Sequence, residues 1–243
     1  MNLQGKTALV TGGGSGIGLG IATALADEGC RVAIAGRNEE KLRAAAAAYR
    51  GSPGLLCRAA DVGNLRDVEQ LVVWADEQMG RVDVLVTSAG INVIKRKMAE
   101  LSIEDWEQML RINATGAYYS MRAVLPQMRA RRDGLIVNIS SVAGKRSSLL
   151  GGVGYSAAKF ASTALGLTVG REESQYNIRV SNIYPGEVDT PILDARPTPV
   201  TPEHRARILK PEDVAAAVVM IAYLPPRAHV PELIIKPTSQ DYA

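Results

Sequence analysis

A short apolar run that leads directly into a glycine-rich stretch restricts the possible folds of this chain most strongly. Residues 7–10 read Thr-Ala-Leu-Val, residues 11–18 read Thr-Gly-Gly-Gly-Ser-Gly-Ile-Gly, and a helical pattern then continues to Gly29. In such a strand–turn–helix unit, backbone N–H groups at the helix N-terminus can receive a phosphate group, and glycines let that group approach the main chain. The sequence therefore predicts an α/β fold that begins with a phosphate-binding turn.

The spacing of the glycines narrows the kind of turn. Thr11, Gly12, Gly16 and Gly18 fit the pattern Thr-Gly-x-x-x-Gly-x-Gly, whereas the strict Gly-x-Gly-x-x-Gly motif and the lysine of a Walker A loop do not occur here. A nucleoside triphosphate is therefore not the expected ligand. The structural alternative is a turn that needs glycine only for its positive φ angles and tight packing.

Strand patterns alternate with helical patterns along the rest of the chain. The expected strands are residues 31–35, 55–59, 82–87, 135–139, 178–183 and 232–236, and the expected helices include residues 65–79, a long helix from residue 103, a helix around Tyr155 and residues 211–224. This alternation predicts a single doubly wound, Rossmann-type domain over residues 1–243. It has a parallel sheet of about seven strands with helices on both faces, and its ligands lie at the C-terminal strand ends.

The end of the second expected strand distinguishes between two nicotinamide cofactors. A carboxylate there, about twenty residues after the glycines, binds the ribose 2′-hydroxyl of NAD, whereas an arginine accommodates the 2′-phosphate of NADP. Gly36 and Arg37 stand at this place, and a guanidinium matches the geometry of a phosphate. We therefore expect NADP(H) rather than NAD(H), with an exposed loop residue as the alternative for Arg37. Asp61, after the third strand, is expected to meet the adenine amino group.

Tyr155 and Lys159 are the candidate reactive pair. They stand four positions apart in an expected helix and therefore share one face. A fixed cation favours a phenolate, so it brings the tyrosine pKa of about 10 toward the working pH of an acid–base catalyst. A core tyrosine beside a solvated lysine has the same spacing in many amphipathic helices. The spacing alone therefore does not indicate catalysis, and the other motifs of the chain must decide.

Taken together, the motifs resemble those of the short-chain dehydrogenase/reductase superfamily over nearly the whole chain. The resemblance rests on Thr11-Gly12-x-x-x-Gly16-x-Gly18, Ala89-Gly90, Asn113, Ser141, Tyr155-x-x-x-Lys159 and Pro185-Gly186-x-x-x-Thr190, which occur in the family's order. It implies an enzyme, such as a ketoreductase, that transfers hydride between NADP(H) and a small carbonyl or secondary-alcohol substrate. It also implies a homo-oligomer, a tetramer most often or a dimer.

The resemblance further implies the roles of individual residues. Tyr155 would donate a proton to a carbonyl or accept one from a hydroxyl, while Lys159 would lower its pKa and bind the nicotinamide ribose. Ser141, with Ser140 in reserve, would hydrogen-bond the reacting oxygen, and Asn113 would hold a water relay behind the lysine. The implied cofactor-binding residues are Gly12, Ser15, Gly16, Ile17, Gly18, Arg37, Asp61, Val62, Ala89, Gly90, Tyr155, Lys159, Pro185, Gly186, Val188 and Thr190.

Two departures from the family's pattern affect the surroundings of these residues. Thr87-Ser88 replaces the asparagine pair usual before Ala89-Gly90, which indicates a different support between strand and helix. The loop from Ser141 to Tyr155 is one residue longer than the commonest spacing in the family. The longer loop affects the expected shape of the substrate pocket, but not the expected roles of Ser141 and Tyr155.

Composition excludes several other classes of partner. The 28 basic and 25 acidic residues give a formal charge of +3, too balanced to indicate a nucleic-acid or membrane partner. The longest apolar helical stretch, residues 214–224, is shorter than the about 20 residues needed to span a bilayer, and the start does not read as a signal peptide. Cys30 and Cys57 suggest reduced thiols in the cytoplasm, and with His204 and His229 as the only histidines no metal site is expected.

Two alternative functions remain beside the oxidoreductase. A regulatory homologue that binds NADP without catalysis would need the glycine turn but not Ser141, Tyr155 and Lys159 together. A serine hydrolase would use Ser156-Ala157-Ala158-Lys159 as an S-x-x-K motif, but the accompanying S-D-N, K-T-G and G-x-S-x-G motifs do not occur.

A substrate loop is expected at about residues 191–210, which have several prolines and no strand pattern and follow a strand end. Arg205 and Arg207 in this segment are candidates for binding a substrate carboxylate or phosphate. Solvated helix charge is the more common explanation for such residues.

Overall fold

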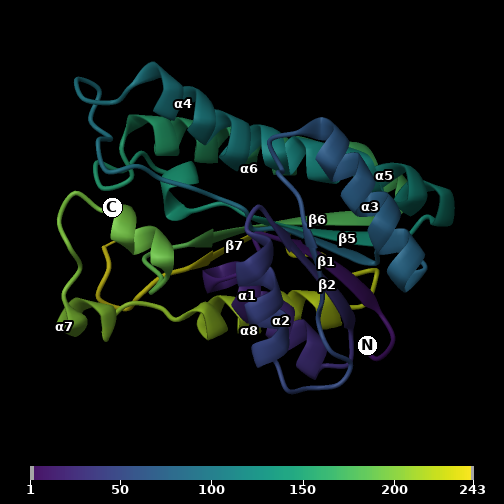
Figure 1. The fold of residues 1–243 in the computed structure, drawn as a ribbon. Coiled ribbons are helices and arrows are strands. Elements are labelled where there is room, and N and C mark those ends of the chain that lie inside the picture. Colours follow the sequence, from purple (N-terminus) through teal and green to yellow (C-terminus); the bar gives the residue numbers. More distant parts are fainter. Residues whose placement is uncertain (1–2, 242–243) are drawn as a thin grey trace.

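A wholly parallel, seven-stranded sheet forms the centre of the molecule in the computed structural model, which describes residues 3–241 (Figure 1). The strands are β1 (Thr7–Thr11), β2 (Arg31–Gly36), β3 (Leu56–Ala59), β4 (Val84–Thr87), β5 (Gly134–Ile139), β6 (Ile178–Pro185) and β7 (Glu232–Ile235). They lie in the order β3-β2-β1-β4-β5-β6-β7, and every neighbouring pair is parallel. The order reverses between β1 and β4, and doubly wound sheets bind their ligands beside such a reversal.

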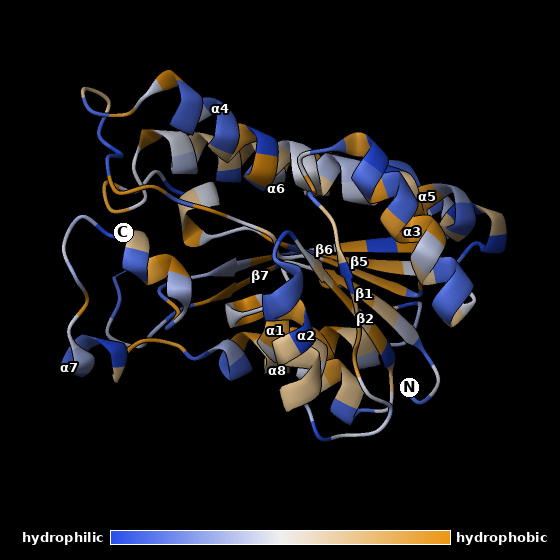
Figure 2. Cartoon of the chain, viewed as in Figure 1, coloured by the Kyte–Doolittle hydropathy of each residue, from blue (hydrophilic) through white to orange (hydrophobic). Residues whose placement is uncertain are grey.

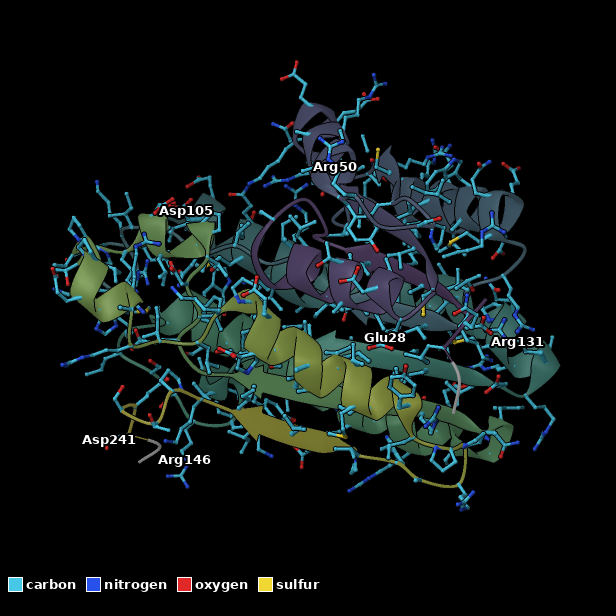
Figure 3. The ribbon with its side chains drawn as sticks, turned by 90° about the horizontal axis from the view of Figure 1, so that it is seen from below. Glu28, Arg50, Asp105, Arg131, Arg146 and Asp241 are labelled. Carbon is cyan, nitrogen blue, oxygen red and sulfur yellow. The ribbon has the colours of Figure 1, made fainter. Side chains whose placement is uncertain are left out.

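Helices cover both faces of the sheet (Figure 1). One layer contains α1 (Gly16–Asp27), α2 (Glu39–Ala48) and α8 (Pro211–Tyr223), and the other contains α3 (Leu65–Met79), α5 (Gly116–Arg131) and α6 (Val153–Glu173). Seen from below, α1 and α8 lie side by side across their face, with charged side chains projecting from the outer surface (Figure 3). The short helices α4 (Ile103–Leu110) and α7 (Pro202–Arg205) lie toward one end of the molecule.

The strands bury alternate residues on opposite faces. Val10 and Ile34 join a core with α1 and α8, whereas Leu9, Ala33 and Leu85 join a second core with α3 and α5. Because both faces are covered, the strands consist mainly of apolar residues with a few buried polar ones such as Asn138 and Asn182, and Figure 2 shows them between helices whose polar residues face outward. This explains why short continuous apolar runs, rather than alternating ones, marked the strands in the sequence.

The predicted strand–helix alternation is confirmed, with one interruption. The long helix expected from residue 103 consists of α4, a π-helical turn η1 (Arg111–Thr115) and α5. The 3₁₀ turns η2 (Val142–Gly144), η3 (Ser174–Tyr176) and η4 (Pro191–Ala195), and the helix α7, were not predicted. No helix within residues 3–241 is both long and apolar enough to cross a membrane.

A buried polar network joins the centre of the sheet to α6. Asn138, which is only 1% exposed, accepts hydrogen bonds through its side-chain oxygen from Thr87 of β4 at 2.8 Å and from the Ser162 hydroxyl of α6 at 3.2 Å. Its side-chain nitrogen donates to the Ser162 carbonyl at 3.0 Å and to the Asn182 side chain of β6 at 2.9 Å. The network ties β4, β5 and β6 to one helix. Thr87 supports the neighbouring strand β5, whereas the sequence suggested support between a strand and a helix.

Asn138→Ala should lower the free energy of unfolding by about 2–4 kcal/mol, because it leaves several buried polar groups without partners. Asn64→Ala is the comparison, since Asn64 caps α3 by accepting from the Arg66 and Asp67 backbone N–H groups at the surface. Loss of this cap should cost about 1 kcal/mol. Urea unfolding of both variants measures the difference, and an equal cost would contradict the importance of the Asn138 network.

Candidate active site

A cavity of about 490 Å³ opens where several parallel strands end. Its lining includes Gly12 after β1, Ser88 after β4, Ser141 after β5 and Gly186 after β6. The loop that leads to α4 and the segment that carries α7 extend beyond the same end of the sheet (Figure 1). The cavity therefore lies at the edge predicted from the sequence.

The glycine turn has the shape needed to receive a pyrophosphate. Gly12 has a φ angle of +70°, and a Cβ atom there would lie 2.7 Å from the backbone of Ala89. A Cβ atom at Gly18 would lie 2.3 Å from the Gly12 carbonyl oxygen. Ser15 precedes α1 without a capping hydrogen bond from its side chain, so the first N–H groups of the helix are available to an anionic ligand. A dinucleotide fits this turn.

Two cations border the adenosine side of the predicted cofactor site. Arg37 follows β2 directly and is exposed, and its side chain makes no hydrogen bond or ion pair with residues 3–241. Lys41, in the first turns of α2, packs beside Gly14, where its side chain lies 3.8 Å from the place of a Cβ atom. The sequence predicted Arg37 but not Lys41, although its position one helical turn after Arg37 is the signal that could have indicated it.

Tyr155 contacts Ser141 at the centre of the cavity. Burial raises the pKa of the Tyr155 phenol, while a hydrogen bond from Ser141 and the positive charge of Arg96 lower it. The Ser141 hydroxyl also accepts from the Ala143 N–H at 3.1 Å, which fixes its orientation. The expectation that a neighbouring lysine brings this pKa toward neutrality is wrong for the protein alone, because desolvation of the phenolate is the larger effect.

Lys159 is buried behind Tyr155. Its ammonium donates to the Ile139 carbonyl at 2.8 Å and lies 5.8 Å from the centre of the Tyr155 ring. Burial lowers the pKa of Lys159 to about 8. A Cβ atom at Gly90 would lie 3.8 Å from this ammonium, so the loop that follows β4 passes directly over the Lys159 side chain.

The π-helical turn η1 presents Asn113 to the same loop. The Asn113 side-chain oxygen accepts from the Ile91 N–H at 2.8 Å, and its nitrogen donates to the Ile91 carbonyl at 2.9 Å. Both polar ends of the side chain are therefore used in holding the loop that carries Gly90. Such turns are frequent at functional sites, but no simple sequence pattern predicts them.

The two adjacent serines have different surroundings. The Ser140 hydroxyl lies 3.2 Å from the Lys159 carbonyl, to which it donates, and 2.9 Å from the Thr163 hydroxyl. It thus packs β5 against α6, whereas Ser141 meets Tyr155. This geometry favours Ser141 over the reserve candidate Ser140 as the residue next to the reacting oxygen.

Thirteen of the predicted site residues line the cavity. They are Gly12, Ser15, Gly16, Ile17, Gly18, Gly90, Ser141, Tyr155, Lys159, Pro185, Gly186, Val188 and Thr190. Arg37, Asp61, Val62, Ala89 and Asn113 lie outside its lining. The Asp61 carboxylate accepts from the Gly63 N–H at 2.9 Å, and the Val62 side chain is buried against Ile112, so Val62 can meet a ligand only through its main chain.

The segment 191–210 borders the cavity through its first residues. It contains η4 and α7 and no strand, as expected, although an isolated parallel bridge joins Val188 to Leu209. Arg205 forms ion pairs with Asp189 at 2.6 Å and Asp194 at 3.0 Å, and neither Arg205 nor Arg207 lines the cavity. The hypothesis that these two arginines bind a substrate anion is therefore not supported.

Other residues at the substrate end of the cavity were missed by the sequence reasoning. Arg96 and Arg196 line it, and Gln240 near the end of the chain accepts from the Glu187 N–H at 2.9 Å. No local motif marks them, because they reach the site from loops far apart in the sequence. Residues 3–241 contain no cluster of histidine, cysteine or acidic side chains that could hold a metal ion.

The S-x-x-K alternative receives no support from the geometry. Lys159 donates to the Ile139 carbonyl, and the hydroxyl of Ser156 accepts from the Ser148 N–H at 3.4 Å. No hydrogen bond joins Ser156 to Lys159 among residues 3–241, so the pair does not form a nucleophile and its base.

Comparison with known proteins places this site in context. A family model described as short chain dehydrogenase matches residues 6–200. An uncharacterized oxidoreductase of Staphylococcus aureus (strain USA300) is 34% identical over 238 residues, which cover 97% of this chain and 98% of that protein.

Two solved structures share the fold and hold a nicotinamide cofactor. The closed form of serine dehydrogenase complexed with NADP+ has a TM-score of 0.89 and 30% identity, covering 98% of this chain and 97% of that chain. A 3-ketoacyl-(acyl-carrier-protein) reductase from Brucella melitensis complexed with NADH has a TM-score of 0.86 and 26% identity, covering 96% of each chain.

Lys159→Met should stabilise the protein at pH 7. A lysine pKa lowered from 10.5 to about 8 means that the unfolded chain binds more protons between these pH values, so the charged lysine destabilises the fold below pH 8. Removing it should contribute about 3 kcal/mol, offset by about 1–2 kcal/mol for the lost hydrogen bond to Ile139.

Urea unfolding at several pH values tests this expectation. The advantage of the variant over the wild type should be largest below pH 8 and should shrink as the pH approaches 10.5. A variant that is less stable than the wild type at pH 7, or an advantage that does not change with pH, would contradict the burial of a charged lysine.

Proposed function

Because this chain belongs to the short-chain dehydrogenase family, whose members are oxidoreductases with a nicotinamide cofactor, we propose that it interconverts a carbonyl compound and a secondary alcohol with NADP(H). The observation that carries this proposal is the contact of Tyr155 with Ser141 in a cavity that the glycine turn also lines. A protein that only bound the dinucleotide would not need a phenol and a hydroxyl oriented toward each other beside a buried lysine.

Different residues bind the cofactor and transfer the proton. The glycine turn and the first N–H groups of α1 hold the pyrophosphate, and when bound the nicotinamide donates or accepts the hydride. During reduction, Tyr155 donates its hydroxyl proton to the carbonyl oxygen. Ser141, oriented by the Ala143 N–H, hydrogen-bonds the same oxygen as negative charge develops on it.

The electrostatics of the site favour reduction near neutral pH. Burial raises the pKa of Tyr155, so the phenol keeps its proton at pH 7 and is in the form that a carbonyl reductase requires. Oxidation of an alcohol needs the phenolate and therefore a higher pH. Lys159 and Asn113 act by position, since one lies beneath the Tyr155 ring and the other fixes the loop above that lysine.

Arg37 and Lys41 support the preference for NADP(H). Both are cations beside the turn that receives the dinucleotide, and Arg37 has no partner within residues 3–241 that would neutralise its charge. A 2′-phosphate supplies that neutralisation, while the ribose hydroxyl of NAD does not. Asp61, Val62 and Ala89 are the further residues that we propose at the adenosine end.

Residues 191–210 act as the substrate loop, since η4 lines the cavity through Ile192 and Leu193.

The outer helices and the cysteines bear on the assembly and the compartment of the proposed enzyme. Tyr118 of α5 and Phe160 of α6 are exposed, and they support an assembly of copies of this chain, a homotetramer or a dimer, through these helices. Cys30 and Cys57 are both free, in keeping with a reducing cytoplasm.

Tyr155→Phe should lower kcat for the reduction of a ketone by about 100- to 10,000-fold, because it removes the proton donor and leaves the ring in place. NADPH consumption followed by absorbance measures the rate, and fluorescence of bound NADPH checks that binding persists. Tyr49→Phe removes a phenol outside the cavity that donates to Asp27 at the surface, so it is the matched control and should keep full activity. A Tyr155→Phe enzyme with more than a tenth of wild-type activity would rule out this role.

Arg37→Asp should lower kcat/KM for NADPH by about 100-fold or more, because an ionic hydrogen bond to the phosphate is replaced by repulsion. The value for NADH should rise, since an aspartate can accept from the ribose hydroxyl. Arg43→Asp makes the same charge change on α2, where Arg43 pairs with Glu39, and should leave the ratio unaltered. Equal use of both cofactors by the wild type, or an unchanged ratio in Arg37→Asp, would refute the assignment.

A further inference from the structure

Arg96 joins three separate segments at the substrate end of the cavity. The residue is 5% exposed, and its guanidinium donates to the carbonyls of Val93 at 2.8 Å, of Leu150 at 2.8 Å and of Ala195. These carbonyls belong to the loop after β4, the loop before α6 and the end of η4. The guanidinium is therefore held in one position by parts of the chain that are up to 99 residues away.

The charge of Arg96 is not neutralised by the protein. No carboxylate within residues 3–241 forms an ion pair with it. Its charged neighbours act differently, because Arg196 repels it and Tyr155 interacts favourably with it. Arg196 itself pairs with Glu187 at 2.9 Å, and Arg205 pairs with Asp189 and Asp194. Arg96 is thus the cavity-lining arginine that lacks a counterion, and a buried cation of this kind is unfavourable unless an anion joins it.

The guanidinium still has donors to offer to such an anion. Arginine carries five N–H groups, and three of them are used by the carbonyls of Val93, Leu150 and Ala195. Each terminal nitrogen therefore keeps one N–H group without an acceptor in the described part of the chain. Two N–H groups on the terminal nitrogens of a fixed guanidinium match the two oxygens of a carboxylate.

Arg96 also lies close enough to the reacting group to act on the same molecule. It lines the same cavity as Ser141 and Tyr155, and its charge is felt at the Tyr155 phenol. Resting on the function proposed above, we propose that Arg96 binds a carboxylate of the substrate, so that the substrate is an oxo acid or the corresponding hydroxy acid. Arg96 is then a specificity-determining residue, pre-organised by its three carbonyl partners.

Matched pairs of acids and methyl esters test this inference with the wild-type protein. The pairs are pyruvate, acetoacetate and levulinate with their methyl esters, reduced with NADPH. For the pair that reacts best, kcat/KM should be at least about 10-fold higher for the acid, because the ester cannot form the ionic hydrogen bonds. Esters that react as well as or better than their acids would overturn the role of Arg96 while leaving the proposed reaction intact.

Substitution separates recognition of the anion from support of the loops. Arg96→Met should lower kcat/KM for the acid by about 100-fold and for its ester by less than about 3-fold. Arg43→Met removes the same charge on α2, where Arg43 pairs with Glu39 outside the cavity, and should leave the acid-to-ester ratio unchanged. An equal loss for acid and ester in Arg96→Met would show that the residue only holds the loops together. Arg96→Lys keeps the positive charge but lacks the paired N–H groups of a guanidinium, so it should reduce the acid-to-ester ratio of kcat/KM by about 10-fold. This variant tests the proposal even where Arg96→Met does not fold.

Binding gives a readout that does not depend on turnover. Calorimetric titration of the wild type with NADP+ present should detect levulinate and give at least about 10-fold weaker binding for methyl levulinate. If no carbonyl compound were reduced at all, the proposed reaction would fail, and this titration would still decide the role of Arg96. Equal affinity for the two ligands, or no binding of levulinate, would overturn it.

Discussion

The side chain of Asn138 holds together the part of the sheet on which the whole site depends. In a parallel sheet all strands end at one edge, but their loops converge on a ligand only if the strands keep one register. Asn138 of β5 reaches Thr87 of β4, Asn182 of β6 and Ser162 of α6 through one saturated set of buried hydrogen bonds. The helix that carries Tyr155 and Lys159 is thereby positioned against the strand that ends at Ser141 and against the loop that carries Gly90.

Desolvation determines the electrostatic character of the site. Burial raises the pKa of Tyr155 and lowers that of Lys159 to about 8, so the site disfavours the phenolate of the one and the ammonium of the other. Arg37 and Arg96 remain cations without counterions in the described chain, one beside the glycine turn and one in the cavity. These charges are complementary to a phosphate at one end of the site and to a carboxylate at the other.

The sequence was sufficient to predict the architecture but not the contacts between distant segments. Apolar runs and turn residues are local signals, so all seven strands and the glycine turn could be predicted, and the motifs led to most residues of the cavity lining. The π-helical turn at Asn113 has no local signal, and the interaction of Arg96 with Ala195 joins residues 99 positions apart. The expected effect of Lys159 on the Tyr155 pKa was wrong because spacing along a helix does not reveal how deeply both groups are buried.

The central claim is that hydride passes directly between the cofactor and the carbonyl carbon while the protein supplies the proton. Reduction of a ketone in ordinary water with NADPH that carries deuterium at both hydrogens of the nicotinamide C4 carbon tests this claim most directly. Mass spectrometry and NMR of the alcohol should find one deuterium, bound to the carbinol carbon, because hydrogen on carbon does not exchange with water. An alcohol without deuterium on that carbon, or NADPH that is bound but never oxidised by any carbonyl compound, would contradict the account.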